Sequence, residues 1–267
     1  MGDRTLFPWR APLSADWTER WSAADARVRE LAPGQVTPEA ASEICTAVRR
    51  LASERLGPRE QLKLEGLARR LMPHAACLKP LRHFRVGLIG NRTLTFLINP
   101  LRAAGLARGL LIDAREAPYD SAASFAFGDA NVFGAEKLDA VAVVLDEGAF
   151  RRSSRLSDRA AEDCETADAE KFLSQLAAAA RKLTSAPAMV ATIPQTAPAL
   201  SSADLATAGT LPRFLMRLNM EIALGGERGD WILWDLAGLA GEIGYGNWFD
   251  PLRFHEAKTP FRIEFVR

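Results

Sequence analysis

The sequence predicts an α/β protein: a three-layer sandwich with a parallel five-stranded sheet, preceded by an N-terminal helical segment. Three observations lead to this prediction. Residues 14–72 show helical spacing of apolar residues, five short apolar runs follow from residue 83 on, and helical stretches separate those runs. We therefore expect residues 1–82 to form the helical segment and residues 83–267 to form the α/β domain.

Three amphipathic helices are expected before the first strand. Each of their segments opens with a capping residue or an early proline: SADWTERWSAADARVRELA, TPEAASEICTAVRRLASERL and PREQLKLEGLARRLM. In the second segment Ile44, Val48 and Leu51 share one helix face, which leaves Arg49 and Arg50 largely in water. We interpret this pattern as a helical layer with one packed face and one solvated face.

From His83 the pattern changes to strand, turn, helix and strand. RVGLIG, NRTLTFLINPLRAAGLARG and LLIDAREAPYD form this βαβ unit, and further strands are expected at residues 138–146, 186–194 and 229–236. Nearly continuous apolar runs are typical of parallel strands covered on both faces, and their crossovers are right-handed. The expected architecture is flavodoxin-like in outline, with a mobile loop at residues 151–163.

Composition favours an ordinary globular protein of the cytoplasm. The 267 residues include 34 Lys and Arg against 33 Asp and Glu, and 48% of them are hydrophobic. A near-neutral chain has no global field that attracts nucleic acid, and no run approaches the roughly 20 apolar residues of a membrane span. Three scattered cysteines without CxxC spacing indicate neither a disulfide framework nor a zinc knuckle. We expect no nucleic-acid partner, no membrane partner and no leader peptide.

The first candidate site residues follow the first strand, because open parallel sheets bind ligands at the carboxyl ends of their strands. The turn GNRT contains Gly90, Asn91 and Thr93 and leads into a helix. Asn91 or Thr93 caps this helix, contacts a ligand, or does both. Neither GxxxxGK[ST] nor GxGxxG occurs here, so the turn is not expected to be a nucleotide-phosphate cradle.

Three more loops supply polar side chains at the same edge. Tyr119 and Asp120 lie in EAPYD after the second strand, Asp146 in LDEG after the third, and Gln195 in IPQT after the fourth. Each has a structural alternative: Tyr119 as a rim aromatic, the acids as helix caps or solvent-facing groups. Gln195 is a neutral donor suited to an oxyanion. We predict that these four residues line a substrate site.

The C-terminal stretch GNWFDPLRFHEAKTPF places an acid, a base and a cation in a loop beyond the last strand: Asp250, His255 and Lys258. A histidine oriented by an aspartate is the usual general base for a hydroxyl nucleophile. His74 and His83 fall in the helical segment or the linker, so His255 is the catalytic candidate. Scattered carboxylates with one histidine have no zinc spacing, and we expect no metal and no cofactor.

Three motifs carry a family resemblance. RVGLIGNRTLTFLINPLRAAGLARGLLIDAREAPYD, LDAVAVVLDEG and WFDPLRFHEAKTPF resemble the SGNH-hydrolase-like N-terminal region of FkbH-like proteins over roughly residues 84–261. The resemblance implies an SGNH-like fold. It also implies a role in loading a glyceryl group, from a phosphorylated three-carbon donor, onto an acyl carrier protein. The family joins this region to a HAD-type phosphatase-like domain.

The chain departs from SGNH hydrolases at their catalytic positions. Those enzymes place a nucleophilic serine in a GDS turn, whereas this chain has Gly90-Asn91-Arg92-Thr93, which leaves Thr93 as the hydroxyl candidate. Asp250 and His255 are five residues apart instead of forming Asp-x-x-His. The DxDx[TV] motif of a HAD domain is absent from the sequence, so we expect that domain on a separate segment or polypeptide.

Three functions remain open at this point. The first is a binding or accessory role in carrier-linked acyl or glyceryl transfer, in polyketide, lipid or polysaccharide biosynthesis. There the predicted site residues surround an acyl or pantetheine-linked group, and an arginine-rich face docks the acidic acyl carrier protein: Arg49, Arg50, Arg69 and Arg70. The second is an SGNH-type esterase or acyltransferase that uses His255 and Asp250. The third is a degenerate interaction module.

Overall fold

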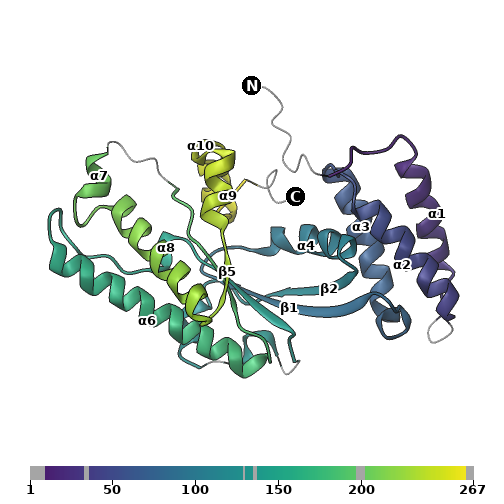
Figure 1. Ribbon diagram of the computed structural model, residues 1–267, viewed down its shortest axis with the longest axis horizontal. Helices are drawn as coiled ribbons and strands as arrows, with labels where there is room; N and C mark the ends of the chain where they lie inside the picture. The colour runs from purple at the N-terminus through teal and green to yellow at the C-terminus, as the bar shows by residue number, and fades with distance from the viewer. Residues whose placement is uncertain (1–9, 33–35, 129, 135–136, 197–201, 263–267) are drawn as a thin grey trace. The chain divides into compact units, whose positions relative to one another are not determined.

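A five-stranded parallel sheet organises the computed structural model, with the strand order β2-β1-β3-β4-β5 (Figure 1). The structure describes residues 10–32, 36–128, 130–134, 137–196 and 202–262. The strands are β1 (Arg82–Gly90), β2 (Leu110–Glu116), β3 (Ala140–Val144), β4 (Met189–Ala191) and β5 (Ile232–Trp234). The predicted α/β class is confirmed, and the strand order is that of flavodoxin-like sheets.

Helices precede, connect and follow the strands. The longer ones are α1 (Trp17–Arg29), α2 (Pro38–Ala52), α3 (Pro58–Leu71), α4 (Thr95–Ala107), α6 (Arg159–Leu183), α8 (Leu211–Arg228) and α9 (Leu236–Ile243). The short α-helices are α5 (Ala122–Ala126), α7 (Ala203–Ala206), α10 (Tyr245–Trp248) and α11 (Pro251–Ala257). Three 3₁₀ segments complete the described elements: η1 (Met72–Cys77), η2 (Ala130–Phe133) and η3 (Glu147–Ala149). No helix within the described ranges is both long and apolar enough to cross a membrane.

The first of two compact units contains the described residues up to Arg85 together with Phe96–Ala114. Its helices begin as their sequences predict: Thr37 accepts a hydrogen bond from the backbone N–H of Ala40 (3.2 Å) at the start of α2, and Pro58 is the first residue of α3. The core joins α1, α2 and α3 to α4 and β2 through buried side chains that include Trp17, Val48, Leu51, Leu64, Leu67, Ala103, Leu106 and Leu111. The predicted domain boundary between residues 82 and 83 stays a prediction.

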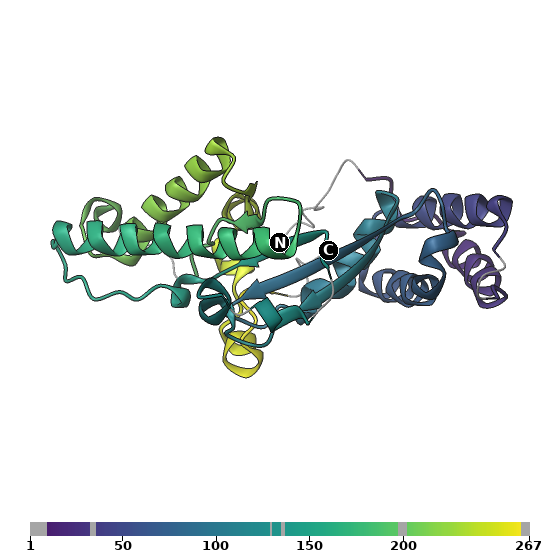
Figure 2. The ribbon, with the colours of Figure 1, turned by 90° about the horizontal axis from the view of Figure 1, so that it is seen from below.

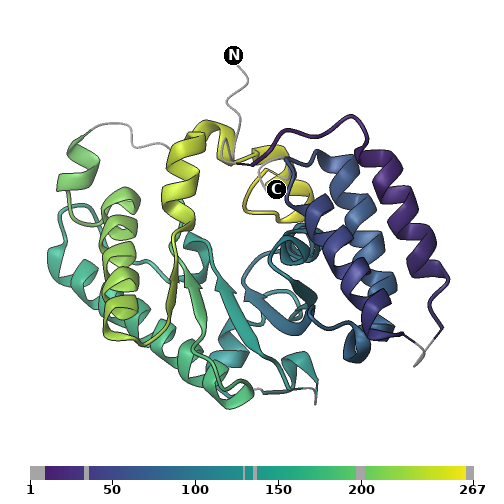
Figure 3. The same ribbon diagram turned by 45° about the vertical axis from the view of Figure 1, so that its right-hand side comes forward.

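The second unit contains Val86–Thr95 and the described residues from Arg115 on. All five residues of β3 are buried, as expected for a central parallel strand with helices on both faces. One face packs on α5, α6 and α8 through a core that includes Ile89, Phe125, Val141, Val143, Leu173, Leu176, Val190, Phe214 and Leu218. Helices α6 and α8 lie side by side (Figures 1 and 3), and Figure 2 displays α6 along its length.

Two buried carboxylates near the start of α6 fix the preceding loop and the first turns of the helix itself. Glu165 accepts hydrogen bonds from the backbone N–H (2.6 Å) and the hydroxyl (2.8 Å) of Ser154. Glu162 is fully buried and accepts from Arg213 Nε and Arg217 Nη1, both at 2.9 Å. Residues 159–163 are already part of α6. The expectation of a mobile loop at residues 151–163 is therefore not supported.

Candidate functional site

The strand order marks one place on the sheet edge as the candidate site. The chain leaves β1 toward β2 on one side and reaches β3 on the other, so the order reverses between β1 and β3. Gly90 pairs with Val144 in the register of these strands, which means that both end at the same level. Open α/β sheets bind ligands in the crevice outside the strand ends at such a switch point. A ligand site is therefore expected at the loops after β1 and β3.

Asn91 and Asp146 connect these two loops. Asn91 Nδ2 donates to Asp146 Oδ1 (2.6 Å), and the backbone N–H of Asp146 donates to Asn91 Oδ1 (3.0 Å). Asp146 Oδ1 also accepts from the backbone N–H of Gly148 (2.8 Å) at the start of η3. Both side chains are buried. The structure thus brings these two predicted site residues together, and their hydrogen bonds fix the two loops to each other.

Arg92 lies at the candidate site, although it was not among the residues predicted from the sequence. Its guanidinium forms an ion pair with Asp146 and lies over the ring of Phe254, 5.0 Å from the centroid. Burial opposes its positive charge, but the hydrogen bond and charge of Asp146, followed by those of Tyr119, raise the pKa of Arg92 above its ordinary value. Arg92 therefore stays charged where the loops after β1, β2 and β3 meet α11. Its position in the turn GNRT, directly after the first strand, was the feature of the sequence that could have identified it.

Lys258 holds the C-terminal segment against the loop after β1. Its carbonyl accepts a hydrogen bond from the backbone N–H of Thr93 (3.2 Å), and its Nζ lies 5.8 Å from the centroid of Phe254. Arg92 and Lys258 thus share one aromatic ring. The yellow C-terminal segment of Figure 3, with α9, α10 and α11, follows β5 and lies above the strands in that view.

Asp250 and His255 are positioned differently from the prediction. They belong to a helix boundary and a helix instead of a loop: Asp250 Oδ1 accepts from the backbone N–H groups of Leu252 (3.1 Å) and Arg253 (3.2 Å) and so caps α11. His255 lies exposed in the last turn of α11, and within the described ranges no hydrogen bond links it to Asp250. The Asp-Pro pair at the cap and first helical position was the missed signal.

Glu116 holds the start of α4. Its Oε1 accepts from the backbone N–H of Leu94 (2.6 Å), and its Oε2 accepts from the hydroxyl of Thr95. The capping role considered for Asn91 is therefore filled by Glu116, because Asn91 is committed to Asp146. A carboxylate beside the amino end of a helix also compensates its positive dipole. The amino end of α4 is consequently occupied by the protein's own side chain.

The remaining predicted residues lie at the same edge or beside it. Tyr119 is 54% exposed and interacts with Arg92, whereas Asp120 is exposed with a left-handed backbone (φ 55°). Gln195 is half-buried in the loop after β4. Gly90 has a packing reason: a Cβ there would lie 2.4 Å from the carbonyl oxygen of Val144. Their predicted roles in substrate binding stay predictions.

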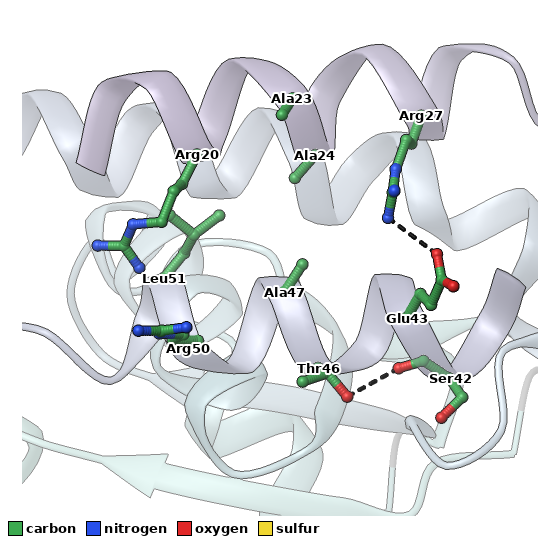
Figure 4. A pocket seen from close by; sticks show the side chains of 10 residues that line it. All are labelled: Arg20, Ala23, Ala24, Arg27, Ser42, Glu43, Thr46, Ala47, Arg50 and Leu51. Carbon is green, nitrogen blue, oxygen red and sulfur yellow. Dashed lines mark hydrogen bonds and ion pairs between the residues drawn. The ribbon is translucent and has the colours of Figure 1, made fainter. Parts of the chain in front are cut away.

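A groove lies between α1 and α2 in the first unit, with a volume of about 530 Å³ (Figure 4). Arg50 from the predicted docking face lines one end of it, across from Arg20, and Arg27 lines the other end, where its Nη1 is paired with Glu43 at 3.0 Å. The other residues around it are Arg20, Ala23, Ala24, Ser42, Thr46, Ala47 and Leu51. Two other arginines of that face have carboxylate partners: Arg69 pairs with Glu65 (3.7 Å) and Arg70 with Asp25.

Comparison with known proteins gives a fold and no family. No family model and no curated protein matches the chain. A solved structure has a similar fold. It is the crystal structure of the N-terminal part of the protein BF1531 from Bacteroides fragilis, containing a phosphatase domain complexed with Mg. The TM-score is 0.57 at 14% sequence identity, over 70% of this chain and 49% of that chain, so the match spans about half the length of the solved chain.

That likeness supports the α/β architecture and assigns no activity. The Mg in the other structure is a property of that protein. Among the residues described for this chain, no group of three or more His, Cys, Asp or Glu side chains is arranged to hold a metal ion. The chemistry of the site depends on its own side chains: an amide, an ion pair, a phenol and a lysine ammonium.

Proposed function

We propose that this chain is an SGNH-like binding domain of the FkbH type that acts in carrier-linked acyl or glyceryl transfer. In this proposal the strand-end site receives the acyl or pantetheine-linked group of an acyl carrier protein without forming a covalent adduct. The observation that carries the proposal is the position of Arg92. It is held by Asp146 at the switch point, beside Tyr119 and Phe254, where this fold class binds its ligands.

The chemistry of these side chains suits recognition more than covalent catalysis. A covalent acyl intermediate requires a hydroxyl or thiol within hydrogen-bond reach of a base. Within the described part of the chain, His255 has no hydrogen bond to any hydroxyl, and Asp250 is engaged as a helix cap. Arg92, Tyr119 and Lys258 offer hydrogen-bond donors, which bind carbonyl or anionic oxygens.

A phosphatase domain in the structural neighbour is consistent with the same proposal. The family that this sequence resembles joins the SGNH-like region to a HAD-type phosphatase-like domain, and the neighbour contains a phosphatase domain. This chain has no DxDx[TV] motif. We infer that a separate segment or polypeptide supplies the phosphoryl chemistry.

The docking part of the proposal has a direct test. Arg50 lines the α1–α2 groove, and its guanidinium has no hydrogen-bond or ion-pair partner among the described residues, so it is free to meet a carboxylate of an acidic carrier. We expect calorimetry with several carrier proteins to detect binding that weakens from 50 to 200 mM salt, as screening of exposed charges requires.

Arg50→Glu should weaken carrier binding about tenfold. Arg59→Glu, on the exposed part of α3, is the matched control and should change it little. Absence of binding to every carrier would remove the proposal.

One observation favours an esterase or acyltransferase as a second candidate. The hydrogen bond from the backbone N–H of Thr93 to the carbonyl of Lys258 keeps the hydroxyl candidate next to the helix that carries His255. Substrate binding would then have to bring the Thr93 hydroxyl and the imidazole together. Turnover of short p-nitrophenyl esters that disappears in His255→Ala would support this candidate, and turnover that survives the substitution would exclude His255 as its base.

A further inference from the structure

Three buried polar groups near the C-terminus have no hydrogen-bond partner among the described residues. They are Trp248 Nε1, on a side chain that is 2% exposed, Thr259 Oγ1, on a side chain that is 1% exposed, and Arg262 Nε. The indole and guanidinium groups can only donate hydrogen bonds. Buried polar groups in native proteins are nearly always satisfied. This segment therefore lacks acceptors.

The same segment has an excess of positive charge. Arg92 has Asp146 as its partner, whereas Lys258 and Arg262 have no carboxylate partner among the described residues. Lys258 and Arg92 both lie close to the ring of Phe254, at 5.8 and 5.0 Å from its centroid. The two ends of the segment are held together, because the backbone N–H of Arg262 donates a hydrogen bond to the carbonyl of Trp248 (2.7 Å). The missing acceptor is therefore expected to be an anion.

The backbone of Lys258 supplies an independent observation. Lys258 follows α11 with φ 54° and ψ 32°, a left-handed conformation that glycine adopts readily and that costs other residues about 1 kcal/mol. The hydrogen bond that its carbonyl accepts from the backbone N–H of Thr93 fixes this turn to the loop after β1. Strained residues cluster at functional sites, and this one keeps a long cationic side chain beside the candidate site.

We propose that Trp248–Arg262, together with Arg92, forms a subsite for a phosphoryl group. A phosphoryl group carries negative charge and offers two unesterified oxygens as a diester, or three as a monoester, and these are the acceptors that the donors of this segment lack. The proposal rests on the proposed function, for which it names the phosphorylated end of the pantetheine arm as the group recognised. Free phosphate has the same chemistry, so the experiment separates the two sources.

The experiment titrates the full chain with pantetheine 4′-phosphate, with pantetheine and with inorganic phosphate, and follows the indole N–H resonance of Trp248, which Trp248→Phe identifies. We expect the phosphorylated arm to bind about tenfold more tightly than pantetheine and to shift this resonance, since each charge-assisted contact contributes roughly this factor. An equal shift with inorganic phosphate alone would assign the subsite to free phosphate. No shift with either phosphate compound would overturn the proposal.

Two variants at one position distinguish binding from structure. Lys258→Gly relieves the left-handed strain, so it should raise the thermal midpoint while it removes the preference for the phosphorylated arm. Lys258→Met should remove the same preference. Arg253→Met is the matched control, because it removes an exposed cation from the same helix and should keep the preference. If the Lys258→Gly variant is less stable and still prefers the phosphorylated arm to pantetheine, the role of Lys258 is only structural.

The outcomes also separate this subsite from the proposed function. Carrier binding without any preference for the phosphorylated arm would leave the proposed function standing and exclude the subsite. A phosphate preference without binding of any carrier protein would keep the subsite and exclude carrier recognition.

Discussion

Asp146 is the residue on which the candidate site depends most. It accepts hydrogen bonds from Asn91 and from the backbone of Gly148, and it forms the ion pair that holds Arg92. An amide in its place would keep the oxygen that accepts from Asn91 and Gly148, whereas Arg92 would keep its charge with no carboxylate beside it. The loss at Arg92 is costly because its side chain is only partly exposed.

Asp146→Asn should therefore destabilise the fold. Because the substitution keeps the shape of the side chain and leaves the Arg92 charge unpaired, we expect a loss of about 2–3 kcal/mol in the free energy of unfolding. Urea denaturation followed by circular dichroism measures it. Asp120→Asn is the control, since Asp120 is exposed in a left-handed conformation that asparagine tolerates, and it should change stability by less than about 0.5 kcal/mol.

Selecting polar residues that follow predicted strands identified some residues of the candidate site and missed others. It selected Asn91 and Asp146 because polar residues after buried strands stand out in sequence. It passed over Arg92, whose importance comes from partners 27, 54 and 162 positions away along the chain, Tyr119, Asp146 and Phe254. It placed Asp250 in a loop, whereas the hydrogen bonds from the backbone N–H groups of Leu252 and Arg253 make it the cap of α11.

Two helices show how the surroundings of a glycine decide the effect of replacing it. Gly66 lies inside α3, where a Cβ would have the flexible guanidinium of Arg70 as its nearest contact at 3.7 Å. Gly225 lies inside α8, where a Cβ would be 2.0 Å from the buried ring of Trp231. Helix propensity favours alanine equally at both positions, so packing decides the sign.

We expect Gly66→Ala to stabilise the protein by about 1 kcal/mol, the propensity difference between the two residues. Gly225→Ala should destabilise it by about 2 kcal/mol, because displacement of Trp231 outweighs the propensity gain. The pair is measured in one urea denaturation series. Equal shifts of the two midpoints would contradict the packing argument, because they would leave propensity as the only cause.

Element positions followed from the sequence where apolar patterns are long, and less well where they are short. The apolar run at residues 138–146 contains β3, and the amphipathic segments at residues 37–56 and 58–72 contain α2 and α3. The runs at residues 186–194 and 229–236 contain strands of only three residues, because their pairing is confined to Met189–Ala191 and Ile232–Trp234. Strand pairing depends on a neighbour that sequence periodicity does not specify.

At the scale of the molecule, the buried carboxylates make stability depend on pH. Burial opposes ionisation of Glu162, but hydrogen bonds from Arg217, from the backbone of Gly209 and from Arg213 lower its pKa below the ordinary value. The pKa of Glu165 is lowered in the same way by Ser153 and Ser154 against the effect of burial. In the acid range the unfolded chain therefore binds protons that the folded chain does not.

The free energy of unfolding should fall as the pH drops from the ordinary glutamate pKa through the lowered one. Urea denaturation at a series of pH values between 3 and 7 measures this dependence. Glu162→Gln should flatten it and lower stability at neutral pH, because Arg213 and Arg217 lose their shared carboxylate. Glu170→Gln, on the exposed part of α6, is the control and should leave the slope unchanged. A Glu162→Gln variant with the slope of the parent chain would contradict the assignment.

The sequence was sufficient to predict the parallel sheet, but not which helices and strands share a hydrophobic core. Alternating strand and helix patterns, with right-handed crossovers, were enough for a parallel sheet of flavodoxin-like outline. They contained no sign that α4 and most of β2 group with the N-terminal helices. That grouping comes from buried contacts of Ala103, Leu106 and Leu111, which belong to the sheet region in sequence but share a core with α1–α3.

This shared core matters to anyone who designs shorter versions of the chain. A fragment that begins at residue 83 would retain Ala103, Leu106 and Leu111 but lose the residues of α1–α3 that cover them. These apolar side chains would then be exposed to solvent. Such a fragment is expected to aggregate on expression. Residues 10–114 are best kept in any shortened version.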